Sequence, residues 1–147
     1  MSKKTYETAL VIGMGLIGSS IARVLKEKKI SKKIFALDKN NEVVSISKNL
    51  KLVDKIENDL KKFKKQFDII FICTPLSSYK NIFEELNSYI TEKTLVTDVG
   101  STKVSVIDDF KQTIDNNKIL FVPAHPIAGL EKSGPEFGFA KIFENRY

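Results

Sequence analysis

Short apolar runs alternate with amphipathic segments along almost the whole chain, and this alternation constrains the fold more than any other feature. The runs occupy residues 8–14, 33–38, 68–75, 94–100 and 118–126. Each has the length and composition of a strand that is buried on both faces. Strands that alternate with helices form parallel sheets, and right-handed crossovers then place helices on both faces. We therefore expect an α/β fold with a doubly wound, mostly parallel sheet.

Three segments between the runs carry apolar residues at helical spacing. These stripes are Ile17, Ile21, Val24 and Leu25; Tyr79, Ile82, Phe83, Leu86 and Ile90; and Val104, Ile107, Phe110 and Ile114. The lysine-rich stretch 48–67 is ambiguous, and it fits a helix end followed by one short strand around "DKIEN". We expect one domain over residues 1–147, with a core in 1–126 and a glycine-containing loop in 127–147.

Composition excludes several classes of protein. The net charge is +6, but all basic residues other than Arg23 and Arg146 are lysines, spread along the chain. A nucleic-acid reader needs clustered arginines for bidentate contacts, so we expect no nucleic-acid partner. No apolar stretch approaches the roughly 20 residues that span a bilayer, and residues 1–10 do not resemble a signal peptide. With a single cysteine, a reducing, cytoplasmic location is the simplest expectation.

The first apolar run leads directly into "GMGLIG", residues 13–18, which opens the first predicted helix. Glycines with G-x-G-x-x-G spacing between a strand and a helix are typical of a dinucleotide site. Gly13 permits the tight turn, Gly15 lets the backbone approach a pyrophosphate, and Gly18 lets helix and strand pack closely. Met14, Leu16 and Ile17 complete the loop, and their backbone N–H groups are candidates for binding phosphate.

Asp38 ends the second run, 20 residues after Gly18. A carboxylate at this position accepts hydrogen bonds from ribose hydroxyls and repels a 2′-phosphate, which favours NAD over NADP. Lys39 is a cation that partly offsets this repulsion. In the alternative interpretation, the glycines serve packing and Asp38 caps a helix.

Other candidate residues follow the third, fourth and fifth runs. Cys73, Thr74 and Pro75 are expected to border the cofactor, with Cys73 as a small apolar residue rather than a nucleophile. Ser101 and His125 follow strands that end at the same edge of the sheet, where a hydroxyl and an imidazole would lie beside the nicotinamide. Alternatively, Ser101 or Thr102 is a helix N-cap and His125 belongs to a proline-rich turn. With one histidine and one cysteine, we expect no metal site.

The segments "VIGMGLIGSS", "CTP", "DVGSTK" and "HPIAGLEKSG", together with Asp38, occur in an order and spacing that resemble the prephenate/arogenate dehydrogenase family of tyrosine biosynthesis. The resemblance covers nearly the whole chain. It implies an NAD-dependent oxidoreductase that decarboxylates prephenate or arogenate to 4-hydroxyphenylpyruvate or tyrosine. It also implies that His125 is the catalytic histidine, that Ser101 supports it, and that Glu131 lies near the substrate.

Members of that family carry a second, largely helical domain that forms a homodimer and completes the substrate site. The sequence has no counterpart, so we expect the isolated domain to be inactive or weakly active. Apolar residues near the C-terminus of this chain would normally contact the helical domain. They are Pro126, Ile127, Leu130, Phe137, Phe139 and Phe143. Two other functions remain open: a non-catalytic NAD-binding module, and a dehydrogenase of a different hydroxy acid.

Overall fold

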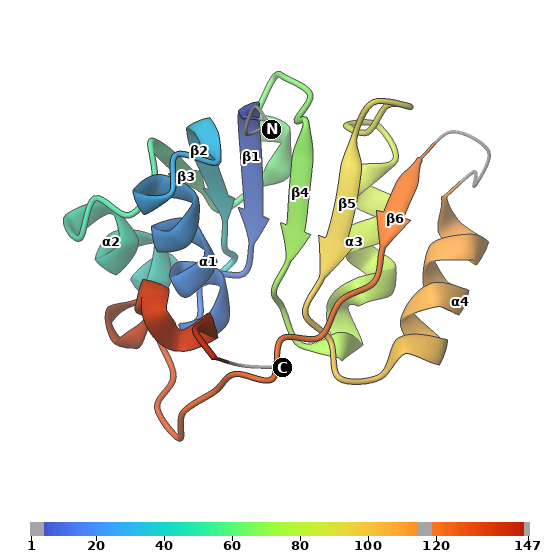
Figure 1. Ribbon diagram of the computed structural model, residues 1–147. Helices are drawn as coiled ribbons and strands as arrows, with labels where there is room; N and C mark the ends of the chain where they lie inside the picture. The colour runs from blue at the N-terminus through green and yellow to red at the C-terminus, as the bar shows by residue number, and fades with distance from the viewer. Residues whose placement is uncertain (1–4, 115–118, 146–147) are drawn as a thin grey trace.

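The computed structural model describes residues 5–114 and 119–145, and these residues form one six-stranded parallel sheet. The strands are β1 (Tyr6–Ile12), β2 (Ser31–Leu37), β3 (Lys55–Glu57), β4 (Ile69–Ile72), β5 (Leu95–Asp98) and β6 (Leu120–Val122). The helices are α1 (Leu16–Glu27), α2 (Asn41–Asn49), α3 (Tyr79–Leu86) and α4 (Lys103–Thr113). The strand order is β3-β2-β1-β4-β5-β6, as Figure 1 shows.

The strand order reverses between β1 and β4, which are adjacent in the sheet although β2 and β3 separate them in sequence. Helices α1 and α2 connect strands on one side of this point, and α3 and α4 connect strands on the other. All carboxyl ends of the strands therefore lie along one edge of the sheet. In doubly wound folds, ligands bind at this edge, beside the point of reversal.

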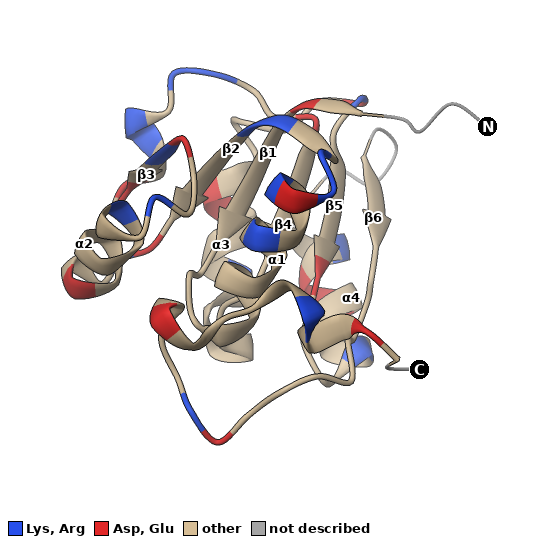
Figure 2. Cartoon of the chain, turned by 60° about the vertical axis from the view of Figure 1, so that its left-hand side comes forward, with Lys and Arg blue, Asp and Glu red and all other residues tan. Residues whose placement is uncertain are grey.

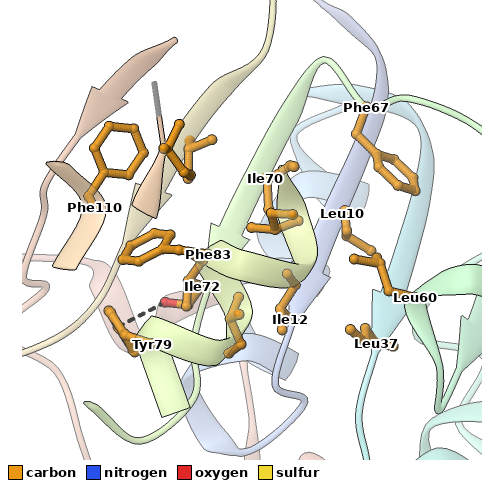
Figure 3. Packing of buried hydrophobic residues seen from close by; sticks show 14 of the residues in the cluster. Leu10, Ile12, Leu37, Leu60, Phe67, Ile70, Ile72, Tyr79, Phe83 and Phe110 are labelled. Carbon is orange, nitrogen blue, oxygen red and sulfur yellow. Dashed lines mark hydrogen bonds between the residues drawn. The ribbon is translucent and has the colours of Figure 1, made fainter. Parts of the chain in front are cut away.

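Two apolar layers, one on each face of the sheet, hold it between the helices. Alternate residues of β1 divide between them: Leu10 and Ile12 join the layer that includes α3 and α4, whereas Ala9 and Val11 face α1. Figure 3 shows part of the first layer, with Phe83 and Phe110 from the two helices beside Ile70 and Ile72 of β4. Because both faces are covered, the central strands consist almost entirely of apolar residues.

The expected strands are confirmed: β1 and β2 begin two residues before their apolar runs, and β4, β5 and β6 are shorter than theirs. The run 118–126 contains β6 at Leu120–Val122, and Lys118 lies outside the described residues, as do residues 1–4 and Arg146. The ambiguous stretch contains the short strand β3, within "DKIEN". Helix α2 was not predicted, because its sequence "NEVVSISKN" has only a short apolar stripe. Its N-cap is Asn40, whose side chain accepts a hydrogen bond from the Glu42 N–H.

Two of the predicted helix faces are wrong in detail. Val104 was placed on the buried stripe of α4 but is 77% exposed, and Val106 is buried in its place, whereas Phe110 and Ile114 are buried as predicted. Helix α1 packs on the sheet through small residues such as Gly18 and Ala22, while Ile21 and Val24 are half-buried. The reason is steric, because small residues let the helix approach the strands closely and leave the larger ones at the flank.

The segment after β6 crosses the carboxyl edge and returns to α1, as Figure 1 shows. The Ser20 hydroxyl accepts a hydrogen bond from the Phe139 N–H at 3.0 Å, and Arg23 Nη1 donates to the Pro135 carbonyl at 3.1 Å. A Cβ on Gly138 would overlap the Ser19 hydroxyl, so this close approach requires glycine. Apolar side chains in the segment stay exposed, with Ile127 at 61% and Leu130 at 51%.

Charged residues are distributed over many elements. In Figure 2, basic segments occur on helices, strands and loops and are interleaved with acidic ones. Within the described part of the chain, no helix is both long and apolar enough to cross a membrane.

Candidate functional site

The turn after β1 is shaped by two glycines that no other residue replaces without strain. Gly13 has φ +90°, and a Cβ there would lie 2.8 Å from the Cys73 carbonyl oxygen at the end of β4. A Cβ on Gly18 would overlap the Gly13 carbonyl oxygen. The sequence-based roles of both glycines are thus consistent with the geometry: Gly13 makes the turn, and Gly18 lets α1 begin against it.

Gly15 differs from the other two glycines. Its φ is negative, and a Cβ there would meet no protein atom within 4 Å. The protein's own packing therefore gives no reason for glycine at this position. Gly15 lines a cavity at the carboxyl edge and precedes α1, so its missing side chain leaves the helix N-terminus open to a ligand.

Asp38 lies directly after β2, across from the glycine turn. Its Oδ2 accepts a hydrogen bond from the Met14 N–H at 2.8 Å, and its Oδ1 accepts one from the Asn40 N–H at 2.9 Å. Each oxygen retains another lone pair, and the half-buried carboxylate lines the cavity. The structure thus holds Asp38 in place with backbone donors while leaving it able to accept hydrogen bonds from hydroxyl groups.

The cavity has a volume of about 540 Å³, within the range of small-molecule sites. Gly13, Gly15, Asp38, Cys73, Thr74 and Pro75, all predicted from the sequence, line it. It lies beside the point where the strand order reverses, between the ends of β1, β2 and β4. The Thr74 hydroxyl is held at its rim by a 2.8 Å hydrogen bond from the Ser78 hydroxyl.

Four residues of the predicted loop do not line the cavity, namely Met14, Leu16, Ile17 and Gly18. The Met14 side chain is fully buried against α1, and only its backbone N–H faces the site, through Asp38. Leu16 and Ile17 form the first turn of α1, so their predicted contribution is limited to their N–H groups.

Lys39, which the sequence placed beside Asp38, also lines the cavity, and several further lining residues were not predicted as part of the site: Val43, Ile82, Glu85, Ser133 and Gly134. Val43 and Ile82 contribute apolar walls from α2 and α3. Lys39 Nζ and Glu85 Oε1 form an ion pair of 3.1 Å at the cavity. Ser133 and Gly134 come from the "EKSG" segment. Two small residues next to a lysine are the one feature of the sequence that could have indicated a close approach to a ligand here.

Cys73 is a partly buried free cysteine at the cavity wall. Burial, followed by the nearby negative charge of Asp98, raises the pKa of its thiol far above the ordinary value. The thiol therefore stays protonated at neutral pH. This agrees with the interpretation of Cys73 as a small apolar residue.

Asp98, the last residue of β5, is 1% exposed and organises the neighbouring loops. Lys103 Nζ at the start of α4 donates to both of its oxygens, at 2.8 and 2.6 Å. Asp98 also accepts hydrogen bonds from the Gly100 N–H at 2.9 Å and the Ala124 N–H at 3.0 Å. The Tyr79 hydroxyl lies 3.3 Å from Oδ2, and the sequence did not indicate a role in the site for Asp98, Lys103 or Tyr79.

Ser101 and His125 both lie at the carboxyl edge of the sheet, as the parallel strands require, and both are exposed. Neither side chain has a hydrogen-bond partner among the described residues. Thr102, not Ser101, holds the N-cap position of α4, and it makes no capping hydrogen bond. His125 lines a second, largely apolar cavity of about 510 Å³ between α1 and β6, whereas Ser101 and Glu131 line neither cavity.

The fold and the site together define a class of protein. A doubly wound parallel sheet carries a tight glycine turn, a helix N-terminus and an acidic residue around one cavity at the point where the strand order reverses. These are the features of a nucleotide-binding domain with the Rossmann fold.

Comparison with known proteins narrows this class. Residues 21–147 match the prephenate dehydrogenase family, nucleotide-binding domain. The chain belongs to this family. The match begins within α1, after the glycine turn, so the geometry of that turn is independent support for nucleotide binding.

Relatives and solved structures agree with the family. The chain is 32% identical to the cyclohexadienyl dehydrogenase of Zymomonas mobilis over 95% of its own length and 47% of the relative. It is 34% identical to the prephenate dehydrogenase of Bacillus subtilis, over 96% and 38% of the two chains. Its fold matches prephenate dehydrogenase from Aquifex aeolicus in complex with hydroxyphenyl propionate and NAD⁺, with a TM-score of 0.86, 29% identity, and coverage of 95% and 48%. The chain thus spans less than half the length of these relatives.

Proposed function

We propose that this chain is the NAD-binding half of an enzyme that oxidatively decarboxylates prephenate or arogenate. One observation carries the proposal: Gly15 and Asp38 line the same cavity, and the protein's own packing leaves both free to contact a ligand. Family membership and the NAD⁺ complex of the Aquifex aeolicus relative support this assignment.

The residues of the cavity fit NAD in shape and chemistry. The open backbone at Gly15 and the N-terminus of α1 suit a pyrophosphate. The Asp38 carboxylate suits the two hydroxyls of an adenosine ribose, and its charge disfavours a 2′-phosphate. Val43 and Ile82 offer apolar surface for the adenine ring. From there, the carboxyl edge leads past Thr74 toward the ends of β5 and β6.

For catalysis we assign the proton to His125. Bound NAD supplies the acceptor for the hydride that leaves the ring carbon bearing the hydroxyl. The His125 imidazole accepts the hydroxyl proton as that carbon is oxidised, and returns it to the same oxygen when loss of CO₂ makes the ring aromatic. General-base assistance of this kind contributes roughly 10²–10⁴-fold. We assign to Ser101 the role of orienting the imidazole or the substrate hydroxyl, and to Glu131 a contact with the substrate.

The remaining parts of the proposal follow from the resemblance. A full-length form is a homodimer whose helical region completes the substrate site, and light scattering tests this. A chain with one cysteine suits a reducing compartment, the cytoplasm.

The test has two stages. The 147-residue chain is titrated with NAD and NADP by calorimetry, and we expect saturable binding that is tighter for NAD. A version extended by the C-terminal half of the Zymomonas mobilis relative is then assayed with prephenate, arogenate and a panel of hydroxy acids. His125→Asn in the extended version is expected to preserve NAD affinity and to lower turnover by about 10²-fold or more.

Each alternative predicts a different result. A non-catalytic module binds NAD, but its extended version oxidises none of the substrates. A different dehydrogenase oxidises a hydroxy acid in preference to prephenate and arogenate. Turnover that His125→Asn leaves unchanged would contradict the assignment of the proton to this histidine.

A further inference from the structure

We infer that the partly buried ion pair between Asp98 and Lys103 positions the two proposed catalytic residues. The inference rests on the proposed function for the roles of Ser101 and His125. That the ion pair holds the backbone next to Ser101 and His125 follows from its contacts alone. Neither residue of the pair lines the proposed NAD cavity, so a role in cofactor binding does not explain them.

The pair contacts the backbone one residue before each of the proposed catalytic residues. Asp98 Oδ2 accepts a hydrogen bond from the Gly100 N–H, and Gly100 precedes Ser101. Asp98 Oδ1 accepts one from the Ala124 N–H, and Lys103 Nζ donates to the Ala124 carbonyl, which forms the peptide bond to His125. The N–H and the carbonyl of Ala124 are therefore both hydrogen-bonded to the same ion pair.

The surroundings of His125 provide little other support. Strand β6 contains only three residues, and the proline-rich segment after it is mostly exposed. The hydrogen bond from the Thr97 hydroxyl to the Val122 carbonyl, at 2.7 Å, ends three residues earlier. Beyond that point, the contacts of Ala124 with the ion pair connect the His125 backbone to the sheet. Loss of the pair therefore frees the segment that carries the imidazole.

Burial of the Asp98 carboxylate makes the pair a rigid support, although the Lys103 side chain is 28% exposed. Asp98 is 1% exposed, and its carboxylate has charge-assisted partners on both oxygens. Gly100 must be small, because a Cβ there would lie 3.0 Å from Asp98 Oδ2 and closer still to the Leu76 side chain. A buried pair with this geometry contributes less to net stability than to a defined arrangement, because the cost of desolvation offsets the attraction. A small net contribution to stability together with a fixed geometry is what we expect of a pair that positions other residues.

The experiment uses His125 as its own reporter, because it is the only histidine in the chain. Lys103→Met removes the charge and preserves most of the side-chain volume. In the isotopically labelled 147-residue chain, we expect the His125 ring resonances to shift and their relaxation to report greater mobility, with NAD affinity unchanged. Lys103→Arg restores the charge and should restore the native signals. Lys111→Met, at an exposed lysine near the other end of α4, is the matched control and should change neither property.

In the extended version, Lys103→Met is expected to lower kcat by about 100-fold with KM for NAD unchanged, because small misplacements of reacting groups have effects of this size. Lys103→Arg should recover most of this loss. A folded Lys103→Met chain with native His125 signals and native kcat would overturn the inference.

A second variant covers the case in which Lys103→Met leaves Asp98 without its partner and the chain unfolds. Asp98→Asn combined with Lys103→Met is neutral and nearly isosteric, and we expect it to fold with a mobile His125. If it folds with native His125 signals, the inference fails. Failure of the proposed function looks different: His125→Asn then leaves turnover unchanged, whatever the ring signals show.

Discussion

The Asp38 carboxylate accepts a hydrogen bond from the Met14 N–H at 2.8 Å, which joins the end of β2 to the glycine turn after β1. The residue proposed to bind ribose is therefore fixed by the loop proposed to bind pyrophosphate. Because this hydrogen bond links the two halves of the cofactor site, a change in one half is transmitted to the other.

Asp38→Asn is expected to weaken NAD binding by about tenfold and to reduce the preference for NAD over NADP. The variant loses the negative charge that strengthens hydrogen bonds to ribose hydroxyls and repels a 2′-phosphate. Calorimetric titrations with both cofactors measure the change. Asp54→Asn is a matched control, because Asp54 accepts a 2.7 Å hydrogen bond from the Ile34 N–H but lies away from the proposed site. Equal losses in the two variants would contradict a specific role for Asp38.

Glu85→Gln is expected to improve NADP binding while leaving NAD binding nearly unchanged. Glu85 pairs with Lys39 at 3.1 Å beside the cavity, and without that partner the lysine is free to contact a 2′-phosphate. The pair is exposed, so the gain is modest, about threefold, as expected for a surface ion pair. The ratio of the two dissociation constants checks this, and a ratio that does not move would rule out Lys39 as a phosphate contact.

Gly15→Ala and Gly18→Ala are expected to separate binding from folding. A methyl group at Gly15 meets no protein atom but enters the path of a pyrophosphate, so NAD affinity should fall by at least about tenfold at native stability. A methyl group at Gly18 overlaps the Gly13 carbonyl oxygen, so the free energy of unfolding should fall by about 1–3 kcal/mol. Thermal unfolding with and without NAD measures both effects. A destabilised Gly15→Ala variant would show that this glycine serves packing.

The free energy of unfolding is expected to fall as the pH rises above about 9, the ordinary pKa of a cysteine. Burial, followed by the charge of Asp98, raises the pKa values of both Cys73 and Tyr79 in the folded chain. Above pH 9 the unfolded chain thus releases protons that the folded chain retains, which favours unfolding. The stabilisation from these two groups is fully present below the pKa that each has in the unfolded chain, and it is lost as the pH rises from that value through the higher pKa of the folded chain. Denaturant titrations at several pH values test it, and Cys73→Ala with Tyr79→Phe should flatten the alkaline slope relative to the unsubstituted chain.

Much of the fold follows from local sequence signals. The strands around Leu10 and Ile70 are apolar on both faces, which predicts a parallel sheet, and Gly13 and Asp38 place the cofactor site on it. Helix α2 was not predicted because packing and the Asn40 cap stabilise it, rather than a strong apolar stripe.

The residues that the sequence did not reveal act through contacts between distant segments. Asp98 and Ala124 meet because β5 and β6 are neighbours, a fact that no local pattern in the chain specifies. The same holds for Glu85 of α3, which reaches Lys39 in the loop after β2. Val104 was misassigned because the helical period does not state which of two adjacent faces meets the sheet.

The central claim is that NAD occupies the cavity between the glycine turn and Asp38, with its reactive end toward His125. Amide chemical-shift mapping of the labelled 147-residue chain during titration with NAD tests this most directly. We predict saturable shifts centred on Gly13, Gly15 and Asp38, accompanied by a shift of the His125 ring signals. The claim is contradicted if binding is absent, or if the shifts centre on the lysine-lined surface around Lys29 and Lys51 instead.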